Sequence, residues 1–377
     1  MDRGEQGSIV VLGSTGSIGQ TTLQLAHRFQ IPVEGLVAGE NWELLNRQIA
    51  QFKPRRVAVK SREVAQFVEG VEEVLVGEEG ILELLRRSSS KKIVNGLVGE
   101  VGFWPTLEGL KLGKEIGLAN KESLVIGGGF LKGWIEKGAI FPLDSEHFAL
   151  YQLLKGRDRG EVAQLIVTAS GGGIRDLELE KIPTATPAEV LNHPNWEMGA
   201  KITVDSATIV NKLFEVLEAY WLFGVQQVEG VIERNSLVHG GVQWKSGELS
   251  LHLSPPDMAL PIGTFLVGEG VELVPPPQLP TLPPLSFHPI EVDRYPLWRL
   301  KPLLLERPQL GVVLNTLDDH LVPLFLAEEI GFGRLLHLLE KGVLEFQNLP
   351  PLSRVEEIGE VKGRVLQWLF SRIGKEV

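Results

Sequence analysis

Residues 8–19 read Ser-Ile-Val-Val-Leu-Gly-Ser-Thr-Gly-Ser-Ile-Gly, a short apolar run followed by a turn with glycines at Gly13, Gly16 and Gly19. A helical pattern of apolar residues follows the turn. Glycine lets the backbone approach a pyrophosphate closely, and the N-terminus of the next helix offers N–H donors. Because the spacing differs from the usual G-x-G-x-x-G, the turn alone leaves both a nucleotide site and an ordinary turn open.

The pattern downstream of the turn predicts the fold class of the first part of the chain. Apolar runs alternate with helical segments, which predicts a parallel, doubly wound α/β sheet. The runs lie at residues 9–12, 37–39, 57–59, 93–97, 116–119 and 139–143.

After about residue 147 the pattern changes. A strand-like run at 164–169 leads into a long stretch to about residue 200 that has many prolines and no periodicity, which is typical of a functional or mobile loop. A helix is expected over 206–223, and three alternating segments predict an antiparallel sheet. The expected parts are a dinucleotide-binding domain over 1–147, a catalytic and dimerisation domain with a lid loop over 148–274, a proline-rich linker over 275–296 and a helical domain over 297–377.

Composition excludes several classes of function. The chain of 377 residues has a formal net charge of −11, which argues against non-specific binding to nucleic acid or an anionic membrane. With no cysteine, it has no disulfide, thiolate or iron–sulfur chemistry. No apolar run is long enough to span a membrane, and the first residues lack the pattern of a signal peptide, so we expect a cytoplasmic protein.

The end of the second expected strand bears on the choice of nucleotide. An acidic residue at this place usually accepts a hydrogen bond from the ribose 2′-hydroxyl, whereas a basic residue suits a 2′-phosphate. The residues here are Gly39, Glu40 and Asn41, so Glu40 favours NAD. Arg47 or Lys60 could nevertheless fold back over this position.

Acidic residues occur in two further segments. Asp144 and Glu146 follow the run at 139–143, and at strand spacing both carboxylates would point to the same side. Glu215 lies one turn after Asn211 and Lys212 on a helix that Ser206 is expected to begin. Three carboxylates without cysteine suit Mg²⁺ or Mn²⁺. Taken alone, the first segment favours a solvated acidic loop or a helix cap, and the second favours an N-cap followed by a surface ion pair.

Taken together, these segments resemble the 1-deoxy-D-xylulose 5-phosphate reductoisomerase family across nearly the whole chain. The matching blocks, in order, are Gly13-Ser-Thr-Gly-Ser-Ile-Gly19, Leu118-Ala-Asn-Lys-Glu-Ser-Leu-Val125, Leu143-Asp-Ser-Glu-His147, Thr168-Ala-Ser-Gly-Gly172, His193-Pro-Asn-Trp-Glu-Met-Gly199, Val204-Asp-Ser-Ala-Thr208 with Asn211, Lys212 and Glu215, Pro256-Asp-Met258 and Asp293-Arg-Tyr-Pro296.

The resemblance implies a fold and an activity. The fold would have an N-terminal Rossmann-like parallel sheet domain, a central α+β catalytic domain and a C-terminal helical domain. The activity would be metal-dependent isomerisation and NADPH-dependent reduction of 1-deoxy-D-xylulose 5-phosphate to 2-C-methyl-D-erythritol 4-phosphate, in non-mevalonate isoprenoid biosynthesis. The family resemblance also implies a homodimer. Many relatives carry a lysine where this chain has Glu40. Because an acidic residue suits the 2′-hydroxyl of NADH better than the 2′-phosphate of NADPH, NADH also stays open as a cofactor.

The resemblance also implies residue roles. The metal would be held by Asp144, Glu146 and Glu215, with Lys121 as a further catalytic residue. The substrate would be bound by Ser145, Ser170, His193, Trp196, Ser206, Asn211 and Lys212. The cofactor would contact Gly13, Ser14, Thr15, Gly16, Ser17, Ile18, Gly39, Glu40, Asn41, Asn120, Lys121, Glu122, Gly199 and Met258.

Two other functions remain open on the sequence. A phosphosugar reductase could keep hydride transfer without the rearrangement, but it would not need the three carboxylates. A catalytically silent nucleotide-binding homologue would be expected to have lost a carboxylate or Lys212, and all four residues are present.

Overall fold

The computed structural model describes residues 7–195 and 198–373, which form two compact units. The first unit takes its residues from 1–123, 131–145 and 257–275, and the second from 124–130, 146–256 and 276–377. Within the described residues, no helix is both long and apolar enough to cross a lipid bilayer.

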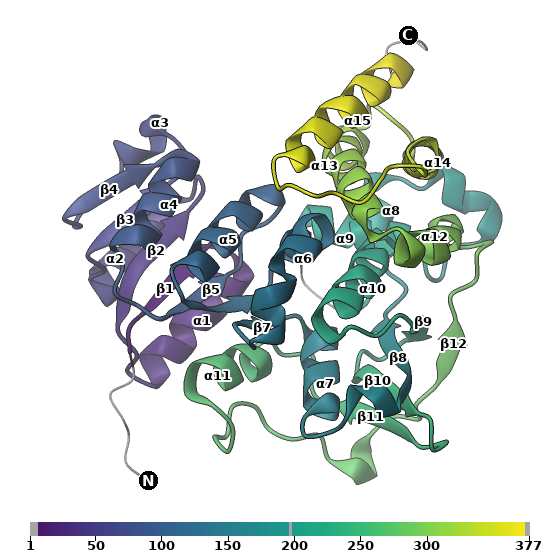
Figure 1. Ribbon diagram of the computed structural model, residues 1–377, viewed down its shortest axis with the longest axis horizontal. Helices are drawn as coiled ribbons and strands as arrows, with labels where there is room; N and C mark the ends of the chain where they lie inside the picture. Colours follow the sequence, from purple (N-terminus) through teal and green to yellow (C-terminus); the bar gives the residue numbers. More distant parts are fainter. Residues whose placement is uncertain (1–6, 196–197, 374–377) are drawn as a thin grey trace. The chain divides into compact units, whose positions relative to one another are not determined.

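The first unit is built on a parallel sheet whose strands, among the described residues, have the order β4-β3-β2-β1-β5-β6-β7 (Figure 1). Strand order reverses between β1 and β5, which is where doubly wound sheets bind ligands at their carboxyl ends. The strands are β1 (Ile9–Leu12), β2 (Val33–Ala38), β3 (Arg56–Val59), β4 (Glu73–Val76), β5 (Lys92–Asn95), β6 (Glu115–Leu118) and β7 (Ile140–Pro142).

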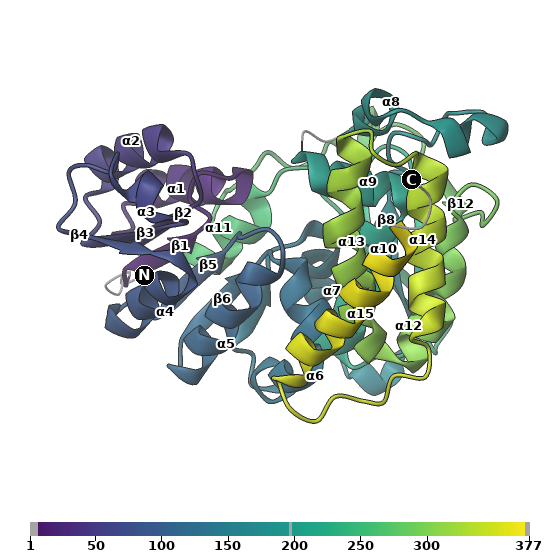
Figure 2. The ribbon, with the colours of Figure 1, turned by 90° about the horizontal axis from the view of Figure 1, so that it is seen from above.

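Helices cover both faces of this sheet, with α1 and α11 on one face and α4 and α5 on the other (Figure 2). The strands read as continuous apolar runs because both faces are buried. The helices are α1 (Ser17–Arg28), α2 (Trp42–Phe52), α3 (Arg62–Ala65), α4 (Gly77–Arg87), α5 (Phe103–Lys111), α6 (Lys121–Glu136) and α11 (Ala259–Val267); η1 (Glu100–Gly102) is a 3₁₀ turn.

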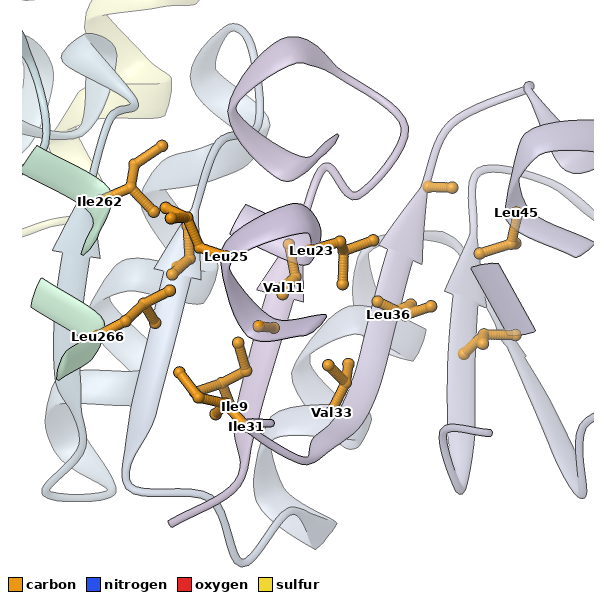
Figure 3. Packing of buried hydrophobic residues seen from close by; sticks show 14 of the residues in the cluster. Ile9, Val11, Leu23, Leu25, Ile31, Val33, Leu36, Leu45, Ile262 and Leu266 are labelled. Carbon is orange, nitrogen blue, oxygen red and sulfur yellow. The ribbon is translucent and has the colours of Figure 1, made fainter. Parts of the chain in front are cut away.

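One core cluster joins α1 and α11 to the sheet (Figure 3). Leu23 and Leu25 of α1 lie among Val11 of β1 and Leu36 of β2, and Ile262 reaches the same cluster from α11. Burying a side chain of this size contributes about 1.5–3 kcal/mol to the free energy of folding. These contacts hold α11 in the first unit, although it follows α1 by more than 200 residues in the sequence. The parallel doubly wound sheet expected for the N-terminal part is therefore confirmed.

The second unit contains a mixed sheet with the strand order β11-β10-β8-β9-β12. We expected an antiparallel sheet here, and this is only partly right because β8 and β9 pair in parallel. The crossover between them is helical, as a parallel pair requires. The strands are β8 (Val162–Ala169), β9 (Val228–Glu233), β10 (Val238–Trp244), β11 (Leu249–Leu253) and β12 (Phe287–Pro289), the last of which is an edge strand in the proline-rich segment.

The helices of the second unit include those of the expected C-terminal helical part. Among them, α10 packs on β8 and β9, and α13 packs against α14 and α15. They are α7 (Ser145–Leu154), α8 (Pro187–Leu191), α9 (Ala200–Thr208), α10 (Val210–Phe223), α12 (Lys301–Glu306), α13 (Gly311–Leu326), α14 (Phe332–Glu345) and α15 (Glu357–Ile373), with 3₁₀ turns η2 (Arg159–Glu161), η3 (Leu179–Thr184), η4 (Leu279–Thr281), η5 (Pro296–Leu300) and η6 (Pro308–Leu310).

Candidate active site

The glycine turn joins β1 to α1 at the carboxyl edge of the parallel sheet. Gly13 has a φ of +81°, and a Cβ at this position would lie 2.6 Å from the carbonyl oxygen of Gly96. Gly16 is the N-cap of α1, and the first N–H groups of a helix have no partner within it. The turn is therefore a backbone cradle with helix N–H donors, as an anionic pyrophosphate requires.

The other residues of this turn have distinct environments. Ser14 is buried, with its N–H donating to Val37 O at 2.8 Å, and Gln48 Nε2 donates to Ser14 O at 2.8 Å. Thr15 is half-buried, Ser17 is exposed, and Ile18 packs against the core cluster. The buried members thus fix the turn, while Ser17 and the following helix N-terminus face solvent.

The end of β2 carries Gly39, Glu40 and Asn41. Asn41 is the N-cap of α2 and accepts a hydrogen bond from Leu44 N. Glu40 is exposed, and Lys60 Nζ donates to its Oε1 at 2.7 Å. The hydrogen bond and the charge of Lys60 lower the pKa of the Glu40 carboxyl. The possibility that Lys60 folds back over this position is therefore realised.

A third group of predicted cofactor residues begins α6. Asn120 is its N-cap, and its side-chain amide donates to Leu97 O and Gly99 O at 3.0 and 2.8 Å. Glu122 accepts from Gly99 N at 3.0 Å. These contacts hold the loop after β5 beside the glycine turn. We did not single out this loop in the sequence, although the glycine at 96 directly after an apolar strand is a usable signal.

Two further residues of the first unit belong to predicted sites. Lys121 Nζ lies 2.5 Å from Asp144 Oδ1, and both side chains are largely buried. Met258 is the N-cap of α11 and packs against the core cluster that also contacts Ile18. Gly199 is the N-cap of α9 in the second unit, so it lies in a different unit from the rest of the predicted cofactor set.

The arrangement of the acidic pair differs from the strand geometry we expected. Ser145 is the first residue of α7, so Glu146 lies in the first turn of a helix, whereas Asp144 precedes it. The strand β7 ends at Pro142, which is why alternation along a strand does not apply to these carboxylates.

Glu146 and Glu215 meet at a buried lysine in the second unit. Lys212 Nζ donates to Glu146 Oε1 at 2.9 Å and also contacts Glu215 Oε2. Asn211 Nδ2 donates to Glu215 Oε1 at 2.7 Å, as the i,i+4 spacing predicts. Side-chain exposure is only 3% for Lys212 and 1% for Glu215, so the alternative of a surface ion pair is wrong.

Electrostatics favour a charged Lys212. Burial by itself would lower the pKa of this amine, but the two neighbouring carboxylates raise it above its usual value. A buried charge of this kind persists only where it is paired and hydrogen-bonded. The carboxylates in turn are gathered around one position of cationic charge.

Some of the predicted substrate-binding residues lie close to one another. Ser170 Oγ lies 2.8 Å from His193 Nε2, and a Cβ on Gly172 would lie 2.8 Å from the backbone of Ser206. The strand end that carries Ser170 therefore packs directly on the segment that carries Ser206. Trp196, which we predicted to bind the substrate, lies outside the described residues.

His193 is held as a neutral ring. Its Nδ1 accepts a hydrogen bond from Asn195 N at 3.2 Å, which leaves the proton on Nε2 to donate to Ser170 Oγ. Burial, together with the positive charge of Arg175, lowers its pKa to about 4.

Ser206 does not begin a helix as we expected. It lies in the last turn of α9, and the break comes at Ile209, whose φ of +69° is left-handed. Such a backbone costs a β-branched residue about 1–2 kcal/mol, so surrounding contacts must hold it. The break separates Ser206 on α9 from Asn211 and Lys212 on α10.

Two buried contacts beside these residues were missing from the sequence reasoning. His147 Nε2 lies 2.9 Å from Glu215 O and so contacts the backbone of a predicted metal ligand. Lys201 Nζ lies 2.9 Å from Asp205 Oδ2 and 2.5 Å from Asp318 Oδ2, which ties α9 to α13. The Asp318 partner is 117 residues from Lys201, so no local pattern could indicate it.

Fold and site together define an α/β protein with a dinucleotide-type turn in one unit and a buried carboxylate–lysine cluster in the other. Sequence models of 1-deoxy-D-xylulose 5-phosphate reductoisomerase and its C-terminal domains match residues 9–128, 140–223 and 253–366. Reductoisomerases of this name from Nautilia profundicola and Wolinella succinogenes are each 46% identical, over 96% of this chain and 99% of theirs.

Solved structures agree with this match. A DOX-P reductoisomerase in complex with NADPH, fosmidomycin and magnesium superimposes with a TM-score of 0.90 at 29% identity, covering 98% of both chains. The Zymomonas mobilis enzyme in complex with NADPH gives a TM-score of 0.86 at 26% identity, covering 99% of this chain and 100% of its own. The chain belongs to the 1-deoxy-D-xylulose 5-phosphate reductoisomerase family.

Proposed function

We propose that this chain isomerises 1-deoxy-D-xylulose 5-phosphate and reduces the product with NADPH to 2-C-methyl-D-erythritol 4-phosphate, in isoprenoid biosynthesis. The observation that carries the proposal is the buried cluster of Lys212 with Glu146 and Glu215. A reductase without rearrangement has no need of it. A silent homologue would gain nothing from keeping a buried Lys212 and Glu215 together with the half-buried Glu146, since burying charge is costly.

The donor set fits a hard divalent cation. Glu146 and Glu215 converge on one position of positive charge, and both are carboxylates, the ligand type that Mg²⁺ and Mn²⁺ favour. Asp144, two residues before Glu146 in the chain, would complete the set. When bound, the metal supplies Lewis-acid polarisation of the substrate carbonyl and NADPH supplies the hydride.

The chain's own residues bind and orient the substrate. His193 donates its Nε2 proton to Ser170 Oγ, so this hydroxyl keeps its own proton to donate to a phosphate oxygen. The backbone of Ser206 lies against Gly172, two residues after Ser170, and Ser206 would supply a second hydroxyl. Because the phosphate is remote from the reacting carbons, its binding energy orients the substrate. Lys121, Ser145, Asn211 and Trp196 complete the proposed substrate and catalytic set.

The cofactor half of the molecule, which comprises the glycine turn and residues 39–41 and 120–122, would bind the cofactor mainly through backbone groups. The turn at Gly13 and Gly16 with the N-terminus of α1 would hold the pyrophosphate, and Glu40 lies at the ribose end. Asn120 and Glu122 shape the neighbouring loop after β5. We further propose Gly199 and Met258 as nicotinamide-side contacts, and a cytoplasmic homodimer as the working form.

The proposal is tested by following NADPH absorbance with 1-deoxy-D-xylulose 5-phosphate and Mg²⁺ or Mn²⁺. We expect metal-dependent NADPH consumption by the unmodified protein, and a fall of about a thousandfold in kcat for Glu215→Gln. Glu180→Gln, which changes an exposed glutamate in η3, is the matched control and should retain full activity. Equal activity of Glu215→Gln and the unmodified protein would contradict the proposed site.

A further inference from the structure

The ribose end of the cofactor half carries a pair of opposite charges. β2 and β3 are neighbouring parallel strands with Ala38 opposite Val59, so the residues after each strand lie at the same edge of the sheet. Glu40 follows β2 and Lys60 follows β3, and their side chains meet at 2.7 Å. The backbone N–H of Lys60 also points to Gly39 O, at 3.5 Å.

The pair decides what can bind at this edge. An ionised Glu40 repels a 2′-phosphate, which carries up to two negative charges, but accepts a hydrogen bond from a 2′-hydroxyl. Lys60 has the opposite preference, because its positive charge attracts the 2′-phosphate more strongly than an uncharged 2′-hydroxyl. Of the two cations that we considered from the sequence, Arg47 donates its Nε–H to Glu43 O on its own helix, whereas Lys60 already reaches the acidic side chain.

The ion pair is also easy to exchange. The two side chains are 67% and 72% exposed, and pairs so exposed gain little free energy because water and salt screen them. A dianionic phosphate placed beside Lys60 therefore competes successfully with the single charge of Glu40.

We propose that Lys60 is the residue of this chain that binds the 2′-phosphate of NADPH, and that Glu40 competes for it and accepts the 2′-hydroxyl of NADH. Specificity then depends on the exchange of Lys60 between Glu40 and the cofactor, and the chain uses both cofactors. This inference rests on the proposed function, because it takes the edge beside the glycine turn as the cofactor site.

The test is direct titration of the full-length protein with NADPH and with NADH, followed by cofactor fluorescence, without substrate or metal. For Lys60→Gln we expect the Kd for NADPH to rise about tenfold and the Kd for NADH to change less than about twofold. Lys60→Arg keeps the charge and should bind NADPH within about threefold of the unmodified protein. Lys91→Gln removes a similar exposed cation from the opposite edge of the same sheet and should change neither Kd.

Glu40→Gln is expected to act in the opposite direction. NADPH should bind several-fold more tightly because its competitor for Lys60 is gone, and NADH should bind more weakly because a carboxylate acceptor is lost. The inference is overturned if Lys60→Gln leaves the ratio of the two Kd values unchanged while the unmodified protein binds NADPH. If the unmodified protein binds neither cofactor, the proposed function fails as well.

Discussion

The proposed cofactor half and the carboxylate half, which is the cluster of Lys212 with Glu146 and Glu215, rely on different chemical groups. The cofactor half uses backbone: glycines at 13 and 16, helix N-termini, and side chains such as Asn120 that hold loops in place. The carboxylate half uses buried charge, with Lys212 held between two glutamates. A site formed by backbone groups tolerates changes of neighbouring side chains, but it does not tolerate a Cβ added to one of its glycines. A buried ion pair, in contrast, is strongly destabilised when one partner is removed, because the other charge is then left without compensation.

The largest effect is expected from removing the central charge of the carboxylate half. Lys212→Met leaves Glu146 and Glu215 without their shared cation, and we expect the free energy of unfolding to fall by about 3–5 kcal/mol. Urea denaturation in the presence of a chelator measures the change. Lys181→Met, which removes one partner of an exposed pair with Glu178, should change stability by less than about 0.5 kcal/mol.

Added Mg²⁺ sharpens this test. If the metal takes the place of the missing positive charge, it should stabilise Lys212→Met more than the unmodified protein, by mass action. Equal stabilisation of both proteins, or a loss no larger than that of Lys181→Met, would contradict the description of this half as a cluster held by mutual charge.

A smaller effect is expected from adding one methyl group to the cofactor half. Gly13→Ala places a Cβ 2.6 Å from Gly96 O in a left-handed backbone conformation, and should destabilise by about 1–3 kcal/mol. NADPH binding should weaken at least about tenfold, because the cradle must open. Gly133→Ala, at an exposed position of α6 with nothing near its Cβ, should be neutral or slightly stabilising. Unchanged NADPH binding by Gly13→Ala would refute the backbone cradle.

The smallest effect concerns the neutral ring of His193. Its pKa is about 4 in the folded protein against 6.5 in a model peptide, so the unfolded chain binds more protons between these values. Stability therefore falls as the pH drops from about 6.5 to 4, and His193→Gln should make this fall shallower. Allowing for solvent screening of a half-buried ring, we expect a difference of about 1 kcal/mol.

Thermal denaturation at several pH values between 4 and 7 measures this difference. His27→Gln, which changes an exposed histidine in α1, should leave the pH dependence as it is in the unmodified protein. A steeper loss of stability for His193→Gln on acidification would contradict a neutral buried ring.

The difference between the two halves also explains what the sequence could predict. The glycine turn and the parallel sheet were predictable because their signals are local: an apolar strand, glycines at fixed spacing, and a helix start. Asn211 and Glu215 were predictable for the same reason, since i,i+4 spacing brings them together on any helix.

The remaining features depend on contacts distant in sequence or on strained backbone. The spacing of Lys212 and Glu215 is the same in an exposed pair and a buried one, so burial could not be deduced from it. The helix break at Ile209 contradicts the propensity of a β-branched residue, and only tertiary packing can hold it. Asp144 and Glu146 were predicted as ligands, and their roles stay a prediction, but the expected local geometry was wrong because the first turn of α7 begins one residue after Asp144.

The most direct test of the account is to identify the product formed from 1-deoxy-D-xylulose 5-phosphate, NADPH and Mg²⁺ by nuclear magnetic resonance. We predict the branched 2-C-methyl-D-erythritol 4-phosphate, formed in equal amount to the NADPH consumed and only when metal is present. A straight-chain reduced sugar phosphate, or NADPH consumption that continues in a chelator, would show that the carboxylate half does not perform the rearrangement and would contradict the account.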